Sequence, residues 1–422
     1  MSATLTEKII AQASGKPFVR PGEVVTARVD LAMIHDSGGP RRVEPILKRL
    51  GVGLWDKDRV VLISDHYVGD PGADSHAILD LTRRWAIENG VTFYDGQGIC
   101  HVVLPQKGHL SPGMFVVGGD SHSPTGGALG AYMFGIGATE MAGVLATGEI
   151  WIKVPETILI EWGGKLNRGV VAKDMMLSLC GHLGMDGGRY QAVQYDGEAV
   201  SALSMPERMT LSNMAAELGA QAGLIAPDQE TADFIAKAGG NPGRWQDWTN
   251  DKEAHYAERH FYDASTLTPQ VAAPHSPANS ASVEAYANQP VDVVYIGACT
   301  GAKYDDLRAA ADVLKGRKCA NDVQLLVAPA SKSDQIKAEN DGILKVFEDA
   351  GAIILANACG ICAGYGSARL DKDIRCISTT ARNFKGRMGD ASSQVWLASP
   401  YTAAASAIKG QIADPRPFLE VQ

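Results

Sequence analysis

The sequence has few of the features that mark membrane, secreted or nucleic-acid-binding proteins. Nowhere do about 18 apolar residues run together, and the first 16 residues carry charges rather than the apolar segment of a signal peptide. The formal net charge is −9, and no long run of Lys or Arg marks a surface for phosphates. We therefore expect a cytoplasmic protein, with neither a membrane nor a nucleic acid as its main partner.

The chain also lacks internal repeats and low-complexity tracts, and it lacks a dinucleotide fingerprint. In the segment Gly135-Ile136-Gly137, the position where a third glycine is expected holds Glu140. Glycine itself is abundant, with 46 among 422 residues, which indicates many tight turns and backbone that lies close to ligands. A chain of this length with 45% hydrophobic residues is expected to form two or three domains.

Alternating strand and helix patterns predict layered α/β domains with largely parallel sheets. Three apolar runs end abruptly in polar or glycine-rich segments, at residues 60–63, 114–117 and 293–296. Because ligands bind at the carboxyl ends of strands in open α/β sheets, these exits are candidate site positions. Further helices are expected at 206–218, 302–315 and 331–350, and further strands at 323–327, 352–355, 374–378 and 395–398.

Residues 266–290 are rich in Pro, Ala, Ser and Asn, show little periodicity and are the best linker candidate. We place a domain boundary there. Residues 1–285 would form an N-terminal region of two domains with a weak division near residue 155. Residues 286–422 would form a third domain.

Three of the seven cysteines are candidate metal ligands. Cys359 and Cys362 form a Cys-x-x-Cys pair, which alone fits a redox pair, half a zinc site or a cluster. Cys299, at a strand exit, adds a third thiolate. An iron–sulfur cluster normally takes four Cys, so three leave one position that solvent or substrate could fill. The other four are expected to be small buried hydrophobes: Cys100, Cys180, Cys319 and Cys376.

A polar loop at residues 118–127 combines an acid, a hydroxyl and a base in Asp120, Ser121 and His122. A helix that starts here would aim free backbone N–H groups at an anion. A lone histidine is usually structural, but repeated acid and base neighbours suggest proton transfer. Further candidates for such pairing are Asp65, His66 and His101.

Arg382 and Arg387 follow the expected strand at 374–378 and offer two guanidinium groups close together in the sequence. Arginine suits bidentate binding of carboxylates. A short basic cluster is more often a solvated surface. Beside a thiolate-bound cluster, it becomes a candidate carboxylate clamp.

As an ordered set, these motifs resemble the aconitase superfamily, most closely the large subunits of 3-isopropylmalate dehydratases and their hydro-lyase relatives. The matching segments cover nearly the whole chain, at 64–66, 98–101, 119–122, 213–217, 297–300, 359–362 and 382–387. The resemblance implies a three-domain aconitase-like α/β core that lacks the mobile fourth (swivel) domain. It also implies reversible dehydration of a small 2-hydroxy di- or tricarboxylate.

The same resemblance implies a set of site residues. A 4Fe-4S cluster with one labile, substrate-binding iron would be held by Cys299, Cys359 and Cys362, with Asn213 beside it. The catalytic acid–base pairs would be Asp65 with His66, His101 with Asp120, and His122 with Glu217. The substrate would be bound by His35, Ser121, Arg382 and Arg387.

Members of this family take their general base, a serine, from the mobile domain, which is a separate small subunit in the isopropylmalate type. The present chain stops at Gln422, shortly after the third domain should close. We therefore expect a small-subunit partner that supplies the swivel domain and the serine, and negligible activity of this chain alone.

Three positions depart from many isopropylmalate enzymes. Leu31 stands where those carry arginine, and Gly301 and Ala381 stand where they carry asparagine. Loss of amides beside a cluster would change its potential or stability. Leu31 suggests a pocket altered around the far end of the substrate, which favours a maleate- or methylmalate-type hydratase, acting on dimethylmaleate or citraconate, as an alternative. A homoaconitase large subunit is a further alternative.

Two alternative interpretations assign the chain to other classes of function. A regulator that binds RNA when its cluster is lost would need a basic surface, which the charge of −9 disfavours. A zinc-stabilised binding protein would leave the set of His, Asp and Glu residues without a purpose.

Overall fold

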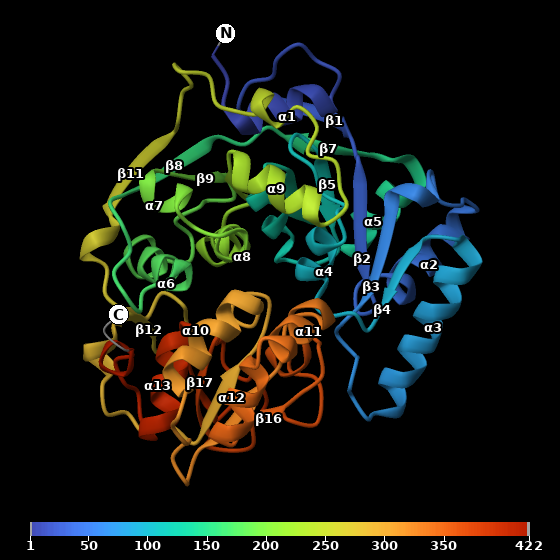
Figure 1. The fold of residues 1–422 in the computed structure, drawn as a ribbon. Helices are drawn as coiled ribbons and strands as arrows, with labels where there is room; N and C mark the ends of the chain where they lie inside the picture. The colour runs from blue at the N-terminus through green and yellow to red at the C-terminus, as the bar shows by residue number, and fades with distance from the viewer. Residues whose placement is uncertain (1, 420–422) are drawn as a thin grey trace.

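The computed structural model describes residues 2–419, and four β-sheets organise them (Figure 1). The smallest sheet is an antiparallel ribbon of β1 (Val24–Arg28) and β7 (Glu149–Lys153). The five-stranded sheet is parallel throughout, in the order β4-β3-β2-β5-β6. Its strands are β2 (Leu31–His35), β3 (Val60–Ser64), β4 (Thr92–Asp95), β5 (Phe115–Gly118) and β6 (Tyr132–Gly135).

The second large sheet has four parallel strands in the order β10-β9-β8-β11. They are β8 (Thr157–Gly163), β9 (Ala192–Asp196), β10 (Ala222–Ile225) and β11 (Glu258–Asp263). Helices α6 (Ala172–Leu183) and α8 (Met205–Asn213) contact each other on this sheet's side of the molecule, and α8 continues into the 3₁₀ turn η3 (Met214–Leu218).

The third sheet has seven strands in the order β13-β12-β18-β17-β14-β15-β16, and it is parallel except at β12 and β13. Its strands are β12 (Gln270–Ala272), β13 (Ser280–Ser282), β14 (Val293–Ile296), β15 (Gln324–Val327), β16 (Ile353–Ile354), β17 (Arg375–Ser378) and β18 (Gln394–Ala398). From β14 onward, this sheet and its helices form the orange and red part of Figure 1.

The remaining helices fill the connections between strands. They are α1 (Leu5–Ala13), α2 (Pro40–Leu50), α3 (Ala73–Asn89), α4 (Cys100–Gln106), α5 (Ala138–Thr147), α7 (Glu198–Ser201), α9 (Gln229–Lys237), α10 (Tyr304–Leu314), α11 (Lys332–Asn340), α12 (Ile343–Ala350) and α13 (Pro400–Lys409). Short 3₁₀ turns that matter for the site are η2 (Ser123–Leu129) and η7 (Gly360–Ala363).

The apolar composition of the parallel strands follows from burial on both faces. All five residues of β2 and all five of β3 are buried. A single hydrophobic cluster extends from Val61 and Cys100 to Val294 and Leu307, so the first and third sheets share one core. This shared core brings the carboxyl ends of the two sheets together.

The predicted α/β fold with largely parallel sheets is confirmed, as are strands at the exits 60–63, 114–117 and 293–296. The single helix expected at 331–350 is two helices, because Gly342 takes a left-handed conformation (φ 72°) between α11 and α12. The expected linker at 266–290 is not irregular throughout, since β12 and β13 lie within it and join the third sheet. The domain boundaries stay predictions.

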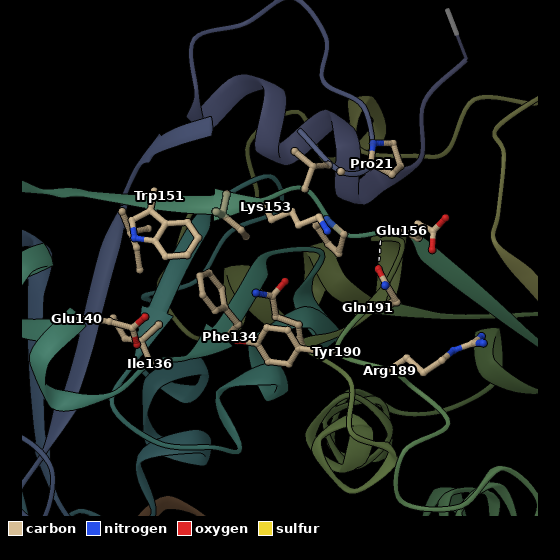
Figure 2. A pocket seen from close by; sticks show the side chains of 16 residues that line it. Pro21, Phe134, Ile136, Glu140, Trp151, Lys153, Glu156, Arg189, Tyr190 and Gln191 are labelled. Carbon is tan, nitrogen blue, oxygen red and sulfur yellow. Dashed lines mark hydrogen bonds between the residues drawn. The ribbon is translucent and has the colours of Figure 1, made fainter. Parts of the chain in front are cut away.

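An open cavity of about 680 Å³ lies beside β7, where Figure 2 shows Trp151 and Tyr190 at its wall. Both aromatic side chains are largely exposed. Among the described residues that line this cavity, none is a predicted site residue. Across residues 2–419, moreover, no helix combines the length and apolar character that a bilayer crossing needs.

Candidate active site

Three acidic residues lie at the carboxyl ends of neighbouring parallel strands. Asp36 follows β2, Asp65 follows β3 and Asp120 follows β5, and β2 lies between the other two strands. Because parallel strands end at the same edge of a sheet, the three carboxylates gather at one place. The side chains of Asp36 and Asp65 are buried, and that of Asp120 is half-buried.

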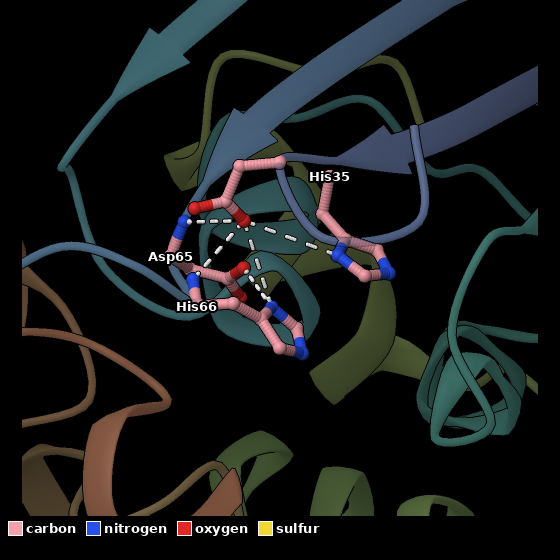
Figure 3. A group of neighbouring side chains, drawn as sticks. His35, Asp65 and His66 are labelled. Atoms are coloured by element: carbon pink, nitrogen blue, oxygen red, sulfur yellow. Dashed lines mark hydrogen bonds and ion pairs between the residues drawn. The ribbon is translucent and has the colours of Figure 1, made fainter. Parts of the chain in front are cut away.

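Asp36 is a fully buried carboxylate that orders the loop after β3. Its Oδ1 accepts the backbone N–H of His66 at 3.1 Å, and its Oδ2 accepts that of Tyr67 at 2.9 Å. A longer contact of 3.4 Å joins Oδ1 to the N–H of Asp65. Figure 3 shows Asp65 and His66 beside the ring of His35. The side chain of Asp36 therefore fixes the backbone that carries Asp65 and His66.

Asp65 and His66 form a buried ion pair, with Oδ1 and Nδ1 2.6 Å apart. Burial opposes both charges, but the attraction and hydrogen bond between the two side chains are stronger. The pairing raises the pKa of His66 to about 10 and lowers the pKa of Asp65 to about 2. His66 also stacks on His35 at a centroid distance of 4.3 Å. At neutral pH the His66 imidazolium can therefore act as a proton donor.

Asp120 connects two more histidines. Its Oδ1 lies 2.7 Å from His101 Nε2 and accepts the backbone N–H of His122 at 2.8 Å. Burial disfavours its charge, but the two histidines hold the pKa of Asp120 well below its ordinary value. Within residues 2–419, the buried Nδ1 atom of His101 has no hydrogen-bond partner. Because His101 Nε2 donates to the ionised Asp120, Nδ1 is available to exchange a proton.

Glu217, in η3, is fully buried and joins the histidines to an arginine. Its Oε1 lies 3.1 Å from His122 Nε2 and accepts from Arg382 Nε at 2.6 Å. Burial raises the pKa of this carboxyl, but His122 and Arg382 outweigh that effect and lower it. Arg382 Nη1 in turn donates to the hydroxyl of Ser121 at 2.8 Å. Residues from both the first and third sheets thus share one hydrogen-bonded network.

The three candidate thiols lie against this network. Cys299 follows β14 and is 7% exposed, and Cys362 in η7 is 5% exposed. Asn213 Nδ2 donates to the Cys299 Sγ atom at 3.2 Å. The backbone N–H of Cys359 donates to the Asp65 carbonyl at 2.8 Å, and Arg387 Nε donates to the Cys362 carbonyl at 2.8 Å. Each of the three cysteines therefore contacts a residue of the predicted site, Cys299 through its thiol and the other two through their backbone.

The donor set fits a polynuclear cluster better than a single zinc ion. Among residues 2–419, two groups of at least three ligand side chains hold their ligand atoms within 4.8 Å of one another, and neither contains a thiol. A zinc ion with bonds to sulfur of about 2.3 Å would bring the sulfur atoms of three thiolates within 4.8 Å of one another. The three candidate thiols do not form such a group. In the same described range, the buried atoms Asn213 Oδ1 and Glu217 Oε2 have no partner. The thiols therefore border polar groups that are available to a bound group or substrate.

The structure corrects the interpretation of Leu31. Leu31 begins β2, is 5% exposed and belongs to the hydrophobic core, whereas His35 and Asp36 lie at the other end of this strand. The expectation that Leu31 alters the substrate pocket is therefore wrong. A side chain at Gly301 has no room either, because its Cβ atom would lie 2.2 Å from Thr379 Cβ. Ala381 is buried, with 2% of its surface exposed.

All fourteen residues predicted for the site lie in this region, but two further residues were not predicted. Asp36 follows a strand exit, so the same rule that selected Asp65 could have found it. Lys173 is a fully buried lysine whose Nζ donates to Thr300 Oγ1 at 3.1 Å, next to Cys299. Its signal in the sequence is weak, because only the fold brings α6 to the cysteine turn.

Histidine–carboxylate pairs, two arginines and three cysteines gather at the strand ends, which is a lining typical of an enzyme active site. The chain belongs to the aconitase family: the family model described as "Aconitase family (aconitate hydratase)" matches residues 64–410. The family implies a 4Fe-4S cluster, and the buried thiols agree with that implication.

Curated relatives match over the full length. The chain is 44% identical to the 3-isopropylmalate dehydratase large subunit 1 of Methanopyrus kandleri, over 99% of this chain and 100% of the relative. It is 41% identical to the probable methanogen homoaconitase large subunit of Methanothermobacter thermautotrophicus, over 98% and 97% of the two chains. The holo-form of Thermococcus kodakaraensis aconitase X is similar in fold alone, with 13% identity, a TM-score of 0.51 and coverage of 87% and 89%. These matches fit a hydro-lyase and do not favour the RNA-binding interpretation.

Proposed function

We propose that this chain is the large subunit of an iron–sulfur hydro-lyase that reversibly dehydrates a small 2-hydroxy di- or tricarboxylate. The observation that carries the proposal is the continuous network from Ser121 through Arg382 and Glu217 to His122. It joins a carboxylate-binding group to proton-transfer groups. Relatives named as 3-isopropylmalate dehydratase large subunits make 3-isopropylmalate the first substrate to test.

Two arginines would bind the carboxylates of the substrate. Arg382 uses Nε for Glu217 and Nη1 for Ser121, and among residues 2–419 no acceptor meets its Nη2 group. Arg387 uses Nε for a backbone carbonyl and keeps its terminal nitrogens for other partners. Arg382 thus keeps Nη2, and Arg387 keeps both terminal nitrogens, as donors for a substrate carboxylate. The imidazole of His35, stacked on His66, would line the same space.

The histidine–carboxylate pairs would handle protons. Loss of hydroxide needs an acid, and His66 is held as an imidazolium by Asp65. His101, oriented by Asp120, and His122, oriented by Glu217, would receive or relay protons and position water. These assignments give Asp65, Asp120 and Glu217 one histidine partner each.

Cys299, Cys359 and Cys362 would hold a 4Fe-4S cluster with one labile iron. When bound, this group supplies a Lewis acid for the hydroxyl and one carboxylate of the substrate. The amide of Asn213, which donates to Cys299 Sγ, would stabilise the thiolate charge. The free state of all seven cysteines in the described chain agrees with a reducing, cytoplasmic compartment, which is part of the proposal.

A small subunit would complete the site with a swivel domain and a serine base. Two observations support this part of the proposal. The relatives are named as large subunits. Ser121 is exposed although the histidines beside it are buried, so the network reaches the surface at one side. A partner that closes over Ser121 would exclude water from the reaction.

The test is an assay of the two-subunit complex, co-purified and reconstituted anaerobically with iron and sulfide. We expect dehydration of one member of a panel containing 3-isopropylmalate, homocitrate, citramalate and 2,3-dimethylmalate, and little turnover by the single chain. An Arg382→Gln complex should retain its iron but lose most of its activity, whereas Lys385→Gln, in the same segment but exposed, serves as the control. A loaded complex that turns over no member of the panel would refute the proposal.

A further inference from the structure

Lys173 is a buried cation that the proposed reaction does not use. It lies in the first turn of α6 and is 1% exposed. Its ammonium donates to Thr380 O at 2.6 Å, to Thr379 O at 3.1 Å and to Thr300 Oγ1 at 3.1 Å. All three acceptors are neutral. Among the described residues, no carboxylate lies within salt-bridge distance of this ammonium.

This position is unfavourable for a positive charge. A buried charge without an ionic partner carries a large desolvation cost. The first turn of a helix adds repulsion, because the helix dipole is positive there. Lys303, another buried lysine of this region, differs in having its own carboxylate, Asp306, at 2.8 Å. The charge of Lys173 must therefore be balanced by negative groups at longer range.

Burial lowers the pKa of Lys173 to about 8, but three groups of the candidate site oppose this effect and favour its charge: the carboxylate of Glu217 and the sulfur groups of Cys299 and Cys362. The carboxyl group of the neighbouring Asp174 also interacts with Lys173. Three thiolates on one cluster give the thiol side of the site a net negative charge. A fixed ammonium nearby would offset that charge without occupying a ligand position.

The same ammonium connects two segments that carry site residues. Thr300 follows Cys299 directly, and its hydroxyl also donates to Thr379 O at 2.9 Å. Thr380 lies two residues before Arg382. Lys173 thus connects the turn that carries Cys299 to the segment after β17 that carries Arg382.

We propose that Lys173 is a positioning residue that holds the Cys299 turn against the Arg382 segment and compensates the negative charge of the thiolate-bound cluster. This inference rests on the proposed function, because it requires a cluster at the three thiols. Two consequences follow. Loss of the Lys173 charge should make the cluster harder to reduce. Loss of the hydrogen bonds from Lys173 to the two segments should weaken the binding of the substrate carboxylate.

The experiment compares the reconstituted two-subunit complex of wild type, Lys173→Met, Lys173→Arg and the control Lys165→Met, an exposed lysine. We expect the cluster midpoint potential of Lys173→Met to lie below that of the control, and its KM to rise about tenfold with a smaller change in kcat. Lys173→Arg should restore the potential, because it keeps the charge. Iron and sulfide contents report whether each complex is loaded.

The outcomes separate this inference from the proposed function. If wild type takes up no cluster, the proposed function fails. If wild type is loaded, equal potentials and KM values in Lys173→Met and the control would overturn the role of Lys173 alone. If Lys173→Met does not fold, Lys173→Gln replaces it. Failure of both neutral variants to fold, while Lys173→Arg folds, would assign Lys173 a purely structural role and also overturn the inference.

Discussion

Replacement of Glu217 by glutamine tests the buried network at its centre. The Glu217 side chain is fully buried, and one oxygen accepts from both His122 and Arg382, whose own side chain is 16% exposed. Glutamine keeps the shape and one acceptor but removes the charge. Removal of one partner from a buried ion pair costs about 3–5 kcal/mol, because the other charge is left uncompensated. We expect Glu217→Gln to lower the free energy of unfolding by about 3 kcal/mol.

The assay is urea unfolding of the purified chain, followed by circular dichroism and by tryptophan fluorescence so that independent unfolding of parts is detected. The matched control is Glu348→Gln, an exposed glutamate on α12. The double variant Glu217→Gln/Arg382→Gln should recover part of the loss, because no buried guanidinium then lacks its counter-ion. A Glu217→Gln loss within about 0.5 kcal/mol of the control would refute the reasoning.

Three further predictions concern the frame of the site. Asp36→Ala leaves three buried N–H groups without their acceptor, so urea unfolding should show a loss of at least about 3 kcal/mol. A double-mutant cycle of Asp65→Asn and His66→Asn should give a larger coupling energy at about pH 6 than at about pH 10. The stabilisation that follows from the raised pKa of His66 is complete below its ordinary pKa of 6.5 and is lost as pH rises through about 10. The stabilisation that follows from the lowered pKa of Asp65 is present above 3.8 and is lost as pH falls through about 2. Gly301→Ala should lower the free energy of unfolding by about 1–3 kcal/mol in a thermal unfolding experiment, because Thr379 occupies the space of the added methyl group. Gly143→Ala, with open space around it, should not destabilise the chain. Equal effects of the two substitutions would contradict this account.

Strand exits were predictable because their signal is local. The β3 strand is an apolar run that ends at Ser64, and the polar residues Asp65 and His66 follow at once. The periodicity that marks a strand and the polarity that ends it both lie within a few residues. The acidic and basic groups of the first sheet could therefore be predicted together, although Asp36 was left out.

The features that the sequence did not predict depend on contacts between distant parts of the chain. Leu31 was expected to affect the pocket because many isopropylmalate enzymes carry arginine at this position, but it lies at the start of β2, and a strand carries its two ends to opposite edges of the sheet. Strands β12 and β13 are three residues each, too short for a clear alternating pattern, and they form only by pairing with β18 and with each other. Lys173 donates hydrogen bonds to carbonyl groups more than 200 residues later in the chain, so its neighbours in the sequence do not indicate its role.

The central claim is that Cys299, Cys359 and Cys362 together hold one iron–sulfur cluster. The most direct measurement is the iron and acid-labile sulfide content of the anaerobically reconstituted chain, compared between wild type, Cys359→Ala and the control Cys376→Ala, a buried cysteine of β17. The account predicts about four iron and four sulfide per chain for wild type and the control, and a marked loss for Cys359→Ala. Uptake of a single zinc ion, or iron content unaffected by Cys359→Ala, would contradict it.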